Sequence, residues 1–170
     1  MPIISLPDVL AWEATQQPAL TPTLRKSFDC GEASLNIFLS NHARQADEEN
    51  TARTWVNLDQ NQKKILGYIS LSNTSIEKDA AAGSMKVYTN PIPALLIGRL
   101  AVDQSAKGQG LGEALLLFGL QKAKEVNASS AIQAIVVDTL NASAEAFYRR
   151  YGFVKIGSTG KMIISTKGLF

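Results

Sequence analysis

The sequence contains few of the residues that mark a metal site or a disulfide-stabilised fold. Among its 170 residues there is one cysteine, Cys30, and one histidine, His42. A single cysteine excludes a disulfide within the chain, and together the two residues make a poor metal site. Cys30 precedes an expected helix, but no base lies near it in the sequence, which favours a packing role over a nucleophilic one. We assign His42 no chemistry.

The sequence also lacks a long apolar run and a recognisable leader. No apolar stretch is long enough to cross a membrane, and the N-terminus has neither a basic start nor an uninterrupted apolar core. We therefore expect a cytoplasmic protein without membrane contacts. The length of 170 residues, with 45% hydrophobic and 19% charged residues, predicts one globular domain over residues 1–170.

Charge is scarce overall but unevenly distributed. The formal net charge is +2, yet residues 139–170 carry five Lys or Arg residues and one Glu. A basic final segment is typical of a chain that binds a polyanion, and it is equally typical of a solvated surface.

Periodicity predicts a mixed α/β chain. The expected helices cover residues 8–16, 32–47 and 113–126, and residues 139–150 predict a loop and a short helix. The expected strands cover residues 51–59, 65–72, 95–103, 131–138, 154–157 and 161–165. The first two strands predict a hairpin, and residues 77–93 predict a loop. Strand, helix and strand over residues 95–138 predict a right-handed parallel crossover.

The most informative stretch is the apolar strand ending at Asp103 and the glycines that follow it. Gly108, Gly110 and Gly112 alternate where the next helix should begin. Glycine allows close approach of a ligand to the backbone, and a helix N-terminus attracts anions, so we expect a phosphate or pyrophosphate seat. The spacing is neither that of a dinucleotide fingerprint nor that of a P-loop. A plain strand–helix turn is the alternative.

Two motifs carry a family resemblance. Lys107-Gly108-Gln109-Gly110-Leu111-Gly112 resembles the coenzyme A pyrophosphate loop of GNAT acetyltransferases, with Lys107 where arginine is commoner. Asn141-x-x-Ala144-x-x-Phe147-Tyr148-x-x-Tyr151-Gly152-Phe153 is similar to the C-terminal pattern of the same family. The two occur in the family's order, on either side of the apolar strand 131–138.

The resemblance implies a fold and a cofactor. The fold is α/β (α+β), with a mixed, mostly antiparallel sheet, a parallel βαβ core and flanking helices, and the cofactor is acetyl-CoA. The residues implied to bind it are Leu100, Ala101, Val102, Lys107, Gly108, Gln109, Gly110, Leu111, Gly112, Asn141 and Phe147.

By the same resemblance Tyr148 is the general acid that protonates the leaving thiolate. A phenol with a pKa near 10 keeps its proton at neutral pH and can donate it. A packing role is the alternative. No carboxylate stands out as a base, because Asp103 ends a strand and Glu113 suits a helix start. An α-amine, with a pKa of about 7.7–8.0, needs a base less than a lysine side chain does.

Residues 28–39 resemble the opening signature of the GNAT toxins of type II toxin–antitoxin modules, and Leu96–Asp103 is similar to another of their segments. That subfamily implies an aminoacyl-tRNA substrate, a ribbon–helix–helix antitoxin, DNA contact only through the antitoxin, and a homodimer. Candidate RNA contacts are Arg44, Arg53, Arg99, Arg149 and Arg150, although Arg99 could instead pair with an internal carboxylate.

Two other functions stay open. One is a GNAT N-acetyltransferase that acts on a small-molecule amine or a protein N-terminus. The other is a non-catalytic binding module that keeps the fold, against which the intact Tyr148 and glycine loop argue.

Overall fold

The computed structural model describes residues 3–61, 63–81, 83 and 90–170. Its strands are β1 (Ile3–Ser5), β2 (Arg53–Leu58), β3 (Ile65–Ile76), β4 (Ile92–Val102), β5 (Ala134–Asp138), β6 (Val154–Ile156) and β7 (Lys161–Ser165). Its α-helices are α1 (Leu6–Ala14), α2 (Leu24–Ser27), α3 (Ala33–Ile37), α4 (Ala43–Glu48), α5 (Leu111–Ser129) and α6 (Ala142–Arg149). A π-helical turn, Phe38–His42, joins α3 to α4.

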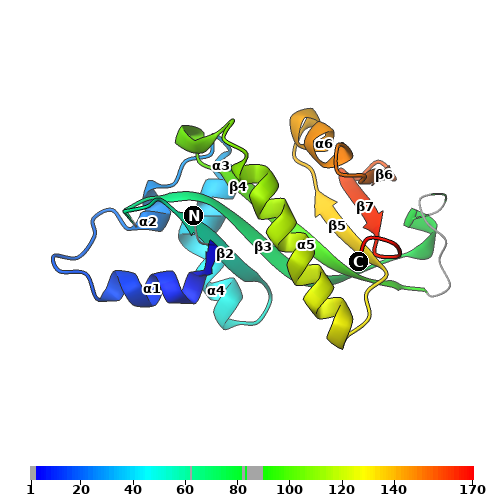
Figure 1. The fold of residues 1–170 in the computed structure, drawn as a ribbon, viewed down its shortest axis with the longest axis horizontal. Coiled ribbons are helices and arrows are strands. Elements are labelled where there is room, and N and C mark those ends of the chain that lie inside the picture. The colour runs from blue at the N-terminus through cyan, green and yellow to red at the C-terminus, as the bar shows by residue number, and fades with distance from the viewer. Residues whose placement is uncertain (1–2, 62, 82, 84–89) are drawn as a thin grey trace. The chain divides into compact units, whose positions relative to one another are not determined.

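The strands form one seven-stranded sheet in the order β1-β2-β3-β4-β5-β7-β6 (Figure 1). The described pairings are antiparallel except that of β4 with β5, which is parallel. This mixed α/β arrangement confirms the expected fold class. The predicted hairpin is β2–β3, and the predicted parallel crossover runs from β4 through α5 to β5.

The chain forms two compact units, and each is described by itself. The first comprises residues 1–71 and 99–118, and the second comprises residues 72–98 and 119–170. In the first unit, β1 pairs with β2 and β2 pairs with β3. Buried apolar side chains from α1, α2, the π-helical turn, α4, β2, β3 and the end of β4 form its core.

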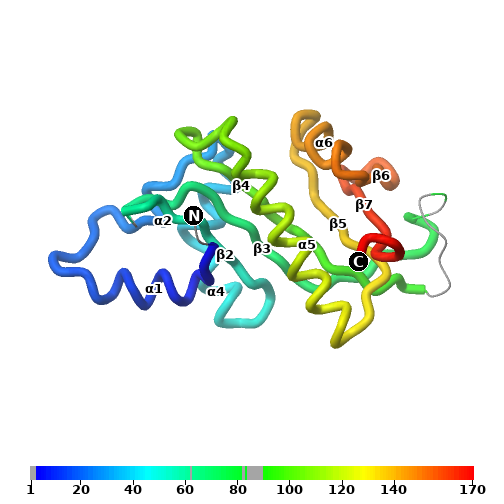
Figure 2. Tube along the Cα trace, in the orientation of Figure 1, coloured from blue at the N-terminus to red at the C-terminus, as the bar shows by residue number. Residues whose placement is uncertain are grey.

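In the second unit the buried strand β5 pairs with β4 on one side and β7 on the other. Ala134, Ile135, Val136 and Val137 are nearly completely buried, as expected of a strand between two neighbours. The chain leaves β5, forms α6, and returns through β6 to β7 (Figure 2). The C-terminal end of β5 therefore leads directly into the helix that carries Tyr148.

Several boundaries differ from the sequence predictions. The strand β1 and the short helix α2 were not predicted. With three and four residues respectively, they are too short to show a hydrophobic period. The strand β4 begins at Ile92, inside the predicted loop, since Pro93 still offers its carbonyl to the amide of Gln133 at 2.8 Å. The loop also contains a 3₁₀ turn, Lys78–Ala81, and residues 82 and 84–89 of it lie outside the described residues.

Gly67 on β3 lies where no larger residue fits. A Cβ atom there would stand 2.9 Å from Leu115 Cδ1 and 3.0 Å from the carbonyl oxygen of Ala101. The second neighbour is backbone and cannot rotate away. A close approach of β3 to the end of β4 and the start of α5 therefore depends on glycine at this position.

We predict that Gly67→Ala lowers the free energy of unfolding by about 1–3 kcal/mol, because overpacking displaces backbone. Urea denaturation measures this. Gly98→Ala is the matched control on β4, since its Cβ would approach only the Leu96 side chain, at 3.7 Å. Equal stability of the two variants would contradict the close approach at Gly67.

Candidate active site

The glycine loop adopts the conformation that glycine permits and other residues disfavour. Gly108 has a φ of +76° and Gly110 a φ of +78°, both left-handed. A Cβ at either position would meet nothing within 4 Å, so the backbone is open on that side. Gly112 already lies inside α5. Two of the three alternating glycines therefore have left-handed dihedrals.

The start of α5 supplies unpaired amides. The first intrahelical bond there runs from the Ala114 amide to the Gly110 carbonyl at 3.1 Å, and the N–H groups before it have no partner in the helix. A hollow of about 160 Å³ opens at this end, lined by Ile3, Asn57, Ala106, Gln109, Gly110, Leu111 and Ala114. Open backbone, free amides and a positive helix end suit a pyrophosphate, so this unit fits acetyl-CoA.

Asp103 fixes the turn that precedes the loop. The residue is 2% exposed, and its carboxylate lies 2.8 Å from Lys64 Nζ. It also accepts hydrogen bonds from the Ser105 amide and hydroxyl and from the Asp29 amide, the last at 3.1 Å. Burial alone would raise the pKa of Asp103, but these donors outweigh it and lower the pKa to about 2. An acid this strong is no general base at neutral pH.

Lys107 faces the protein and not the open side of the loop. Its Nζ donates to the Cys30 carbonyl at 2.8 Å. The remaining predicted cofactor residues of this unit, Leu100, Ala101 and Val102, form the end of β4, where Ala101 is buried and its neighbours are half-buried. Their predicted bonds to the pantetheine arm stay a prediction.

Tyr148 lies on α6 with only 4% of its surface exposed. Its ring packs edge-on against Phe147, with centroids 5.1 Å apart, and against Phe153, with centroids 5.6 Å apart. Burial raises the pKa of Tyr148 well above its usual value, and the negative charge of Asp138 adds to the effect. The phenol therefore keeps its proton at neutral pH and can act as a donor.

The rest of the second motif builds this helix. Asn141 is the N-cap, and its Oδ1 accepts from the Ala144 amide at 2.9 Å. Gly152, with a φ of +87°, lies just beyond the other end. Phe147 contacts the rings of Tyr148 and Tyr151. The structure thus gives Asn141 and Phe147 structural roles, and their predicted contacts with the cofactor stay predictions.

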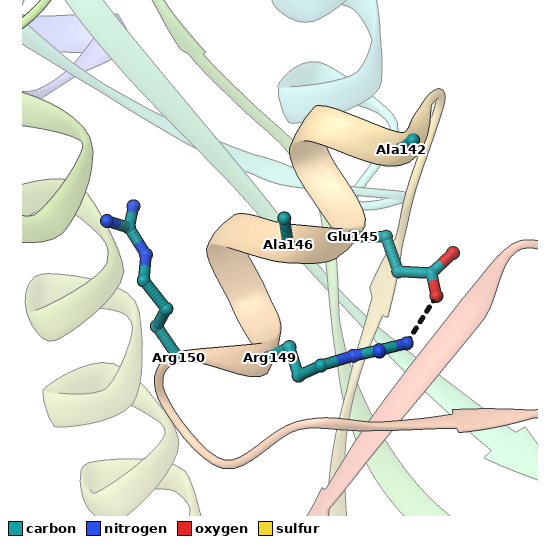
Figure 3. Close-up of a pocket in the computed structure, with 5 residues that line it drawn as sticks. All are labelled: Ala142, Glu145, Ala146, Arg149 and Arg150. Atoms are coloured by element: carbon teal, nitrogen blue, oxygen red, sulfur yellow. Dashed lines mark hydrogen bonds and ion pairs between the residues drawn. The ribbon is translucent and has the colours of Figure 1, made fainter.

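A surface hollow of about 460 Å³ runs along α6 (Figure 3). Its lining is Ala142, Glu145, Ala146, Arg149 and Arg150. Glu145 pairs with Arg149 at 2.6 Å and with Lys155 at 3.1 Å. The Arg150 guanidinium extends away from this pair, and its carbon lies 5.7 Å from the centre of the Phe147 ring. Of the two candidate RNA contacts that line this hollow, Arg149 is held in an ion pair, and the Arg150 guanidinium has only the aromatic ring as a partner within the described residues.

The other three candidate arginines are in the first unit. Arg44 forms an exposed ion pair with Glu48 at 2.7 Å, and Arg53 pairs with Asp47 at 2.8 Å. The Arg99 guanidinium lies 3.7 Å from the centre of the Phe38 ring. Within the described part of the chain no carboxylate pairs with Arg99, so an aromatic contact replaces the internal ion pair considered as its alternative.

Cys30 is a core residue. It is 5% exposed, and burial raises the pKa of its thiol. The sulfur lies 3.2 Å from Asn36 Oδ1. A buried, protonated thiol is a poor nucleophile, which confirms the packing interpretation. His42 is exposed at the end of the π-helical turn.

Comparison with known proteins identifies the family of the chain. The model of the acetyltransferase (GNAT) family matches residues 12–153. The chain belongs to the GNAT acetyltransferase family. A curated relative, a tRNA-acetylating toxin of Mycobacterium tuberculosis, is 30% identical over 128 residues, which cover 75% of this chain and 76% of the relative.

Two solved structures are similar at the level of the whole fold. AtaT complexed with acetyl-methionyl-tRNAfMet has a TM-score of 0.77 and 28% identity, covering 85% of this chain and 89% of that chain. A mutant AtaT bound to acetyl-CoA and the C-terminus of the antitoxin AtaR has a TM-score of 0.73 and 26% identity, covering 85% and 86%. This GNAT acetyltransferase uses acetyl-CoA, as its motifs predict. Within its described residues no helix is long and apolar enough to span a membrane.

Sequence reasoning missed the residues that hold the glycine loop from outside. Lys64, Asp29 and Asn36 contact the Asp103 turn or one another, yet none belongs to the loop motif. The sequence offered one indication, because residues 28–39 and 96–103 each resemble a segment of the GNAT toxins. Their contact with each other is visible only in the structure.

We predict that Asp103→Asn lowers the free energy of unfolding by about 2 kcal/mol at pH 7, because the folded-state pKa lies below the unfolded value. This stabilisation is present above about pH 4 and is lost as the pH falls towards 2. Urea denaturation of both proteins at pH 7, 4 and 3 should show the difference shrinking. A difference independent of pH would contradict the assignment to an ionised Asp103.

Proposed function

We propose that this protein transfers the acetyl group of acetyl-CoA to the α-amine of aminoacyl-tRNA. The observation that supports it most is the similarity to a tRNA-acetylating toxin over three quarters of both chains. The chain also contains an acid of the right type, because burial raises the pKa of Tyr148 and keeps the phenol protonated at neutral pH. The glycine loop has the open backbone that a pyrophosphate needs.

The chain has two roles in this chemistry. Acetyl-CoA supplies an activated thioester. The amides at Gly110–Gly112 would bind its pyrophosphate, and the Tyr148 hydroxyl would give its proton to the departing sulfur. The described carboxylates Asp103, Glu145 and Asp138 are each engaged by a lysine. This favours an acceptor that is partly neutral without a base, as an α-amine is.

The proposal includes the toxin's partners. Acetylation of charged tRNA would block translation, so the chain would act as the toxin of a toxin–antitoxin pair. Its antitoxin would be a ribbon–helix–helix protein, DNA would be reached only through that partner, and the toxin would be a homodimer. The structure of the related AtaT bound to the antitoxin AtaR supports the antitoxin as a partner.

We also propose that residues 1–170 act as one GNAT domain.

We predict that Tyr148→Phe lowers the rate of acetyl transfer to charged tRNA by about 10²–10⁴-fold, since the proton donor is lost. The measurement uses labelled acetyl-CoA and a mixture of charged tRNAs, followed by ester hydrolysis and identification of the N-acetylated amino acid. Tyr151→Phe, which removes a neighbouring phenol hydroxyl, is the control and should retain activity.

The outcomes separate the candidate functions. Equal activity of wild type and Tyr148→Phe would remove Tyr148 from the mechanism. Acetylation of polyamines or peptides without any label on charged tRNA would favour a GNAT enzyme for other amines. Binding of acetyl-CoA without transfer to any amine would favour a non-catalytic module.

We predict that Arg150→Ala raises the KM for charged tRNA several-fold and lowers its salt dependence by about one ion, as expected when one phosphate contact is lost. Lys122→Ala is the matched control, because Lys122 is not among the candidate RNA contacts and its charge is paired with Glu125. Steady-state rates at several salt concentrations test this. An identical salt slope for wild type and Arg150→Ala would exclude Arg150 from the RNA contact.

A further inference from the structure

A set of hydrogen bonds joins residues 29–36 to the turn between β4 and the glycine loop. The Gln104 amide donates to the Asp29 carbonyl at 2.9 Å, and Gln104 Nε2 donates to Asp29 Oδ2 at 2.7 Å. In the other direction, the Asp29 amide donates to Asp103 Oδ2 at 3.1 Å. Three bonds thus fix Asp29 against residues 103 and 104.

The next contact is made by the residue directly before the loop. Lys107 Nζ donates to the Cys30 carbonyl at 2.8 Å. Lys107 is followed at once by Gly108, whose left-handed φ begins the loop. The lysine therefore ties the first residue of the glycine loop to a segment that lies more than 70 positions earlier in the sequence.

The receiving segment is itself held in shape. Asp29 Oδ1 accepts from the Gly31 amide at 2.9 Å and from Asn36 Nδ2 at 2.8 Å. The amide oxygen of Asn36 accepts from the Cys30 amide at 3.0 Å. The bonds from Gly31 and Asn36 lower the pKa of Asp29. Asn36 thus fixes both Asp29 and Cys30, the two residues that contact the turn.

The loop needs such support because its own residues provide little. Nothing lies within 4 Å of the Cβ positions of Gly108 and Gly110, and glycine has a wider range of backbone conformations than any other residue. The loop is held by α5 on one side, by Lys107 on the other, and by one exposed bond of its own, from Gln109 Nε2 to the Ser105 carbonyl at 3.2 Å. Fixing a binding loop in its bound shape improves affinity, because less ordering remains to be done on binding.

We infer that Asp29, Asn36 and Lys107 are positioning residues for the coenzyme A pyrophosphate, and that Lys107 acts by fixing the glycine loop and not as a phosphate ligand. The inference rests on the proposed role of the loop as the pyrophosphate seat. It assigns a function to the segment 29–36, which lies far from the loop in sequence and supplies none of the cofactor-binding residues predicted above.

The test compares two ligands that differ in the pyrophosphate. Binding of CoA is measured by calorimetry, and binding of pantetheine, which has no pyrophosphate, is measured by competition with CoA. Asn36→Ala removes no charge, so a direct electrostatic effect on phosphate is absent from it. We expect Asn36→Ala and Lys107→Met each to weaken CoA binding about tenfold and to leave pantetheine binding within twofold of wild type.

The double variant and two controls sharpen the test. If both residues act through the same loop, Asn36→Ala combined with Lys107→Met should bind CoA within threefold of the weaker single variant, because coupled effects do not add. Gln104→Ala cuts one exposed bond to Asp29 and should weaken CoA binding a few-fold, with little risk to folding. Lys63→Met removes one exposed positive charge from the same unit and should leave CoA binding unchanged.

Three results would overturn the inference. Wild-type CoA affinity in Asn36→Ala and Gln104→Ala, with weak binding in Lys107→Met, would make Lys107 a direct phosphate ligand. Equal weakening of CoA and pantetheine would indicate a general folding role. Equal affinity of the wild-type protein for CoA and pantetheine would show that the loop does not bind the pyrophosphate. None of these measurements needs an acceptor, so failure to acetylate tRNA would leave the inference standing.

Discussion

The structure of the first unit depends on one buried carboxylate. Asp103 ends β4, and its charge is stabilised by Lys64, by Ser105 and by the amide of Asp29. An ionised group buried to this extent is tolerated only when donors surround it. Those donors come from three separate parts of the chain. The carboxylate thus contacts the residue before β3, the segment after α2 and the turn before the glycine loop.

The consequence is a loop whose open backbone is held from outside. Gly108 and Gly110 have left-handed dihedrals and open space at their Cβ positions, while Lys107 and α5 fix the two ends. In the second unit, α6 buries Tyr148 among aromatic rings, and Asn141 caps the helix. In the proposed reaction the glycine loop would hold the coenzyme A pyrophosphate, and Tyr148 would donate a proton to the departing sulfur.

Much of this could be predicted from the sequence, because the signals are local. Alternating glycines before a helix, an apolar strand and the Tyr148 motif all lie within short stretches. Each of β4, α5, β5 and α6 overlaps its predicted element, although β4 begins three residues early, at Ile92. The misses have a physical cause. The strand β1 is too short to show a period, and Lys107 could not be assigned to the Cys30 carbonyl because that contact spans more than 70 positions. Contacts of this kind also gave Arg99 an aromatic partner in place of a carboxylate.

The most direct test of the account is a crystal structure of the protein with acetyl-CoA bound. The account predicts pyrophosphate oxygens within hydrogen-bond distance of the amides of Gly110, Leu111 and Gly112. It also predicts that Lys107 Nζ stays on the Cys30 carbonyl and that Tyr148 presents its hydroxyl to the thioester sulfur. A pyrophosphate bound elsewhere, or Lys107 released from Cys30 and turned onto the phosphates, would contradict it.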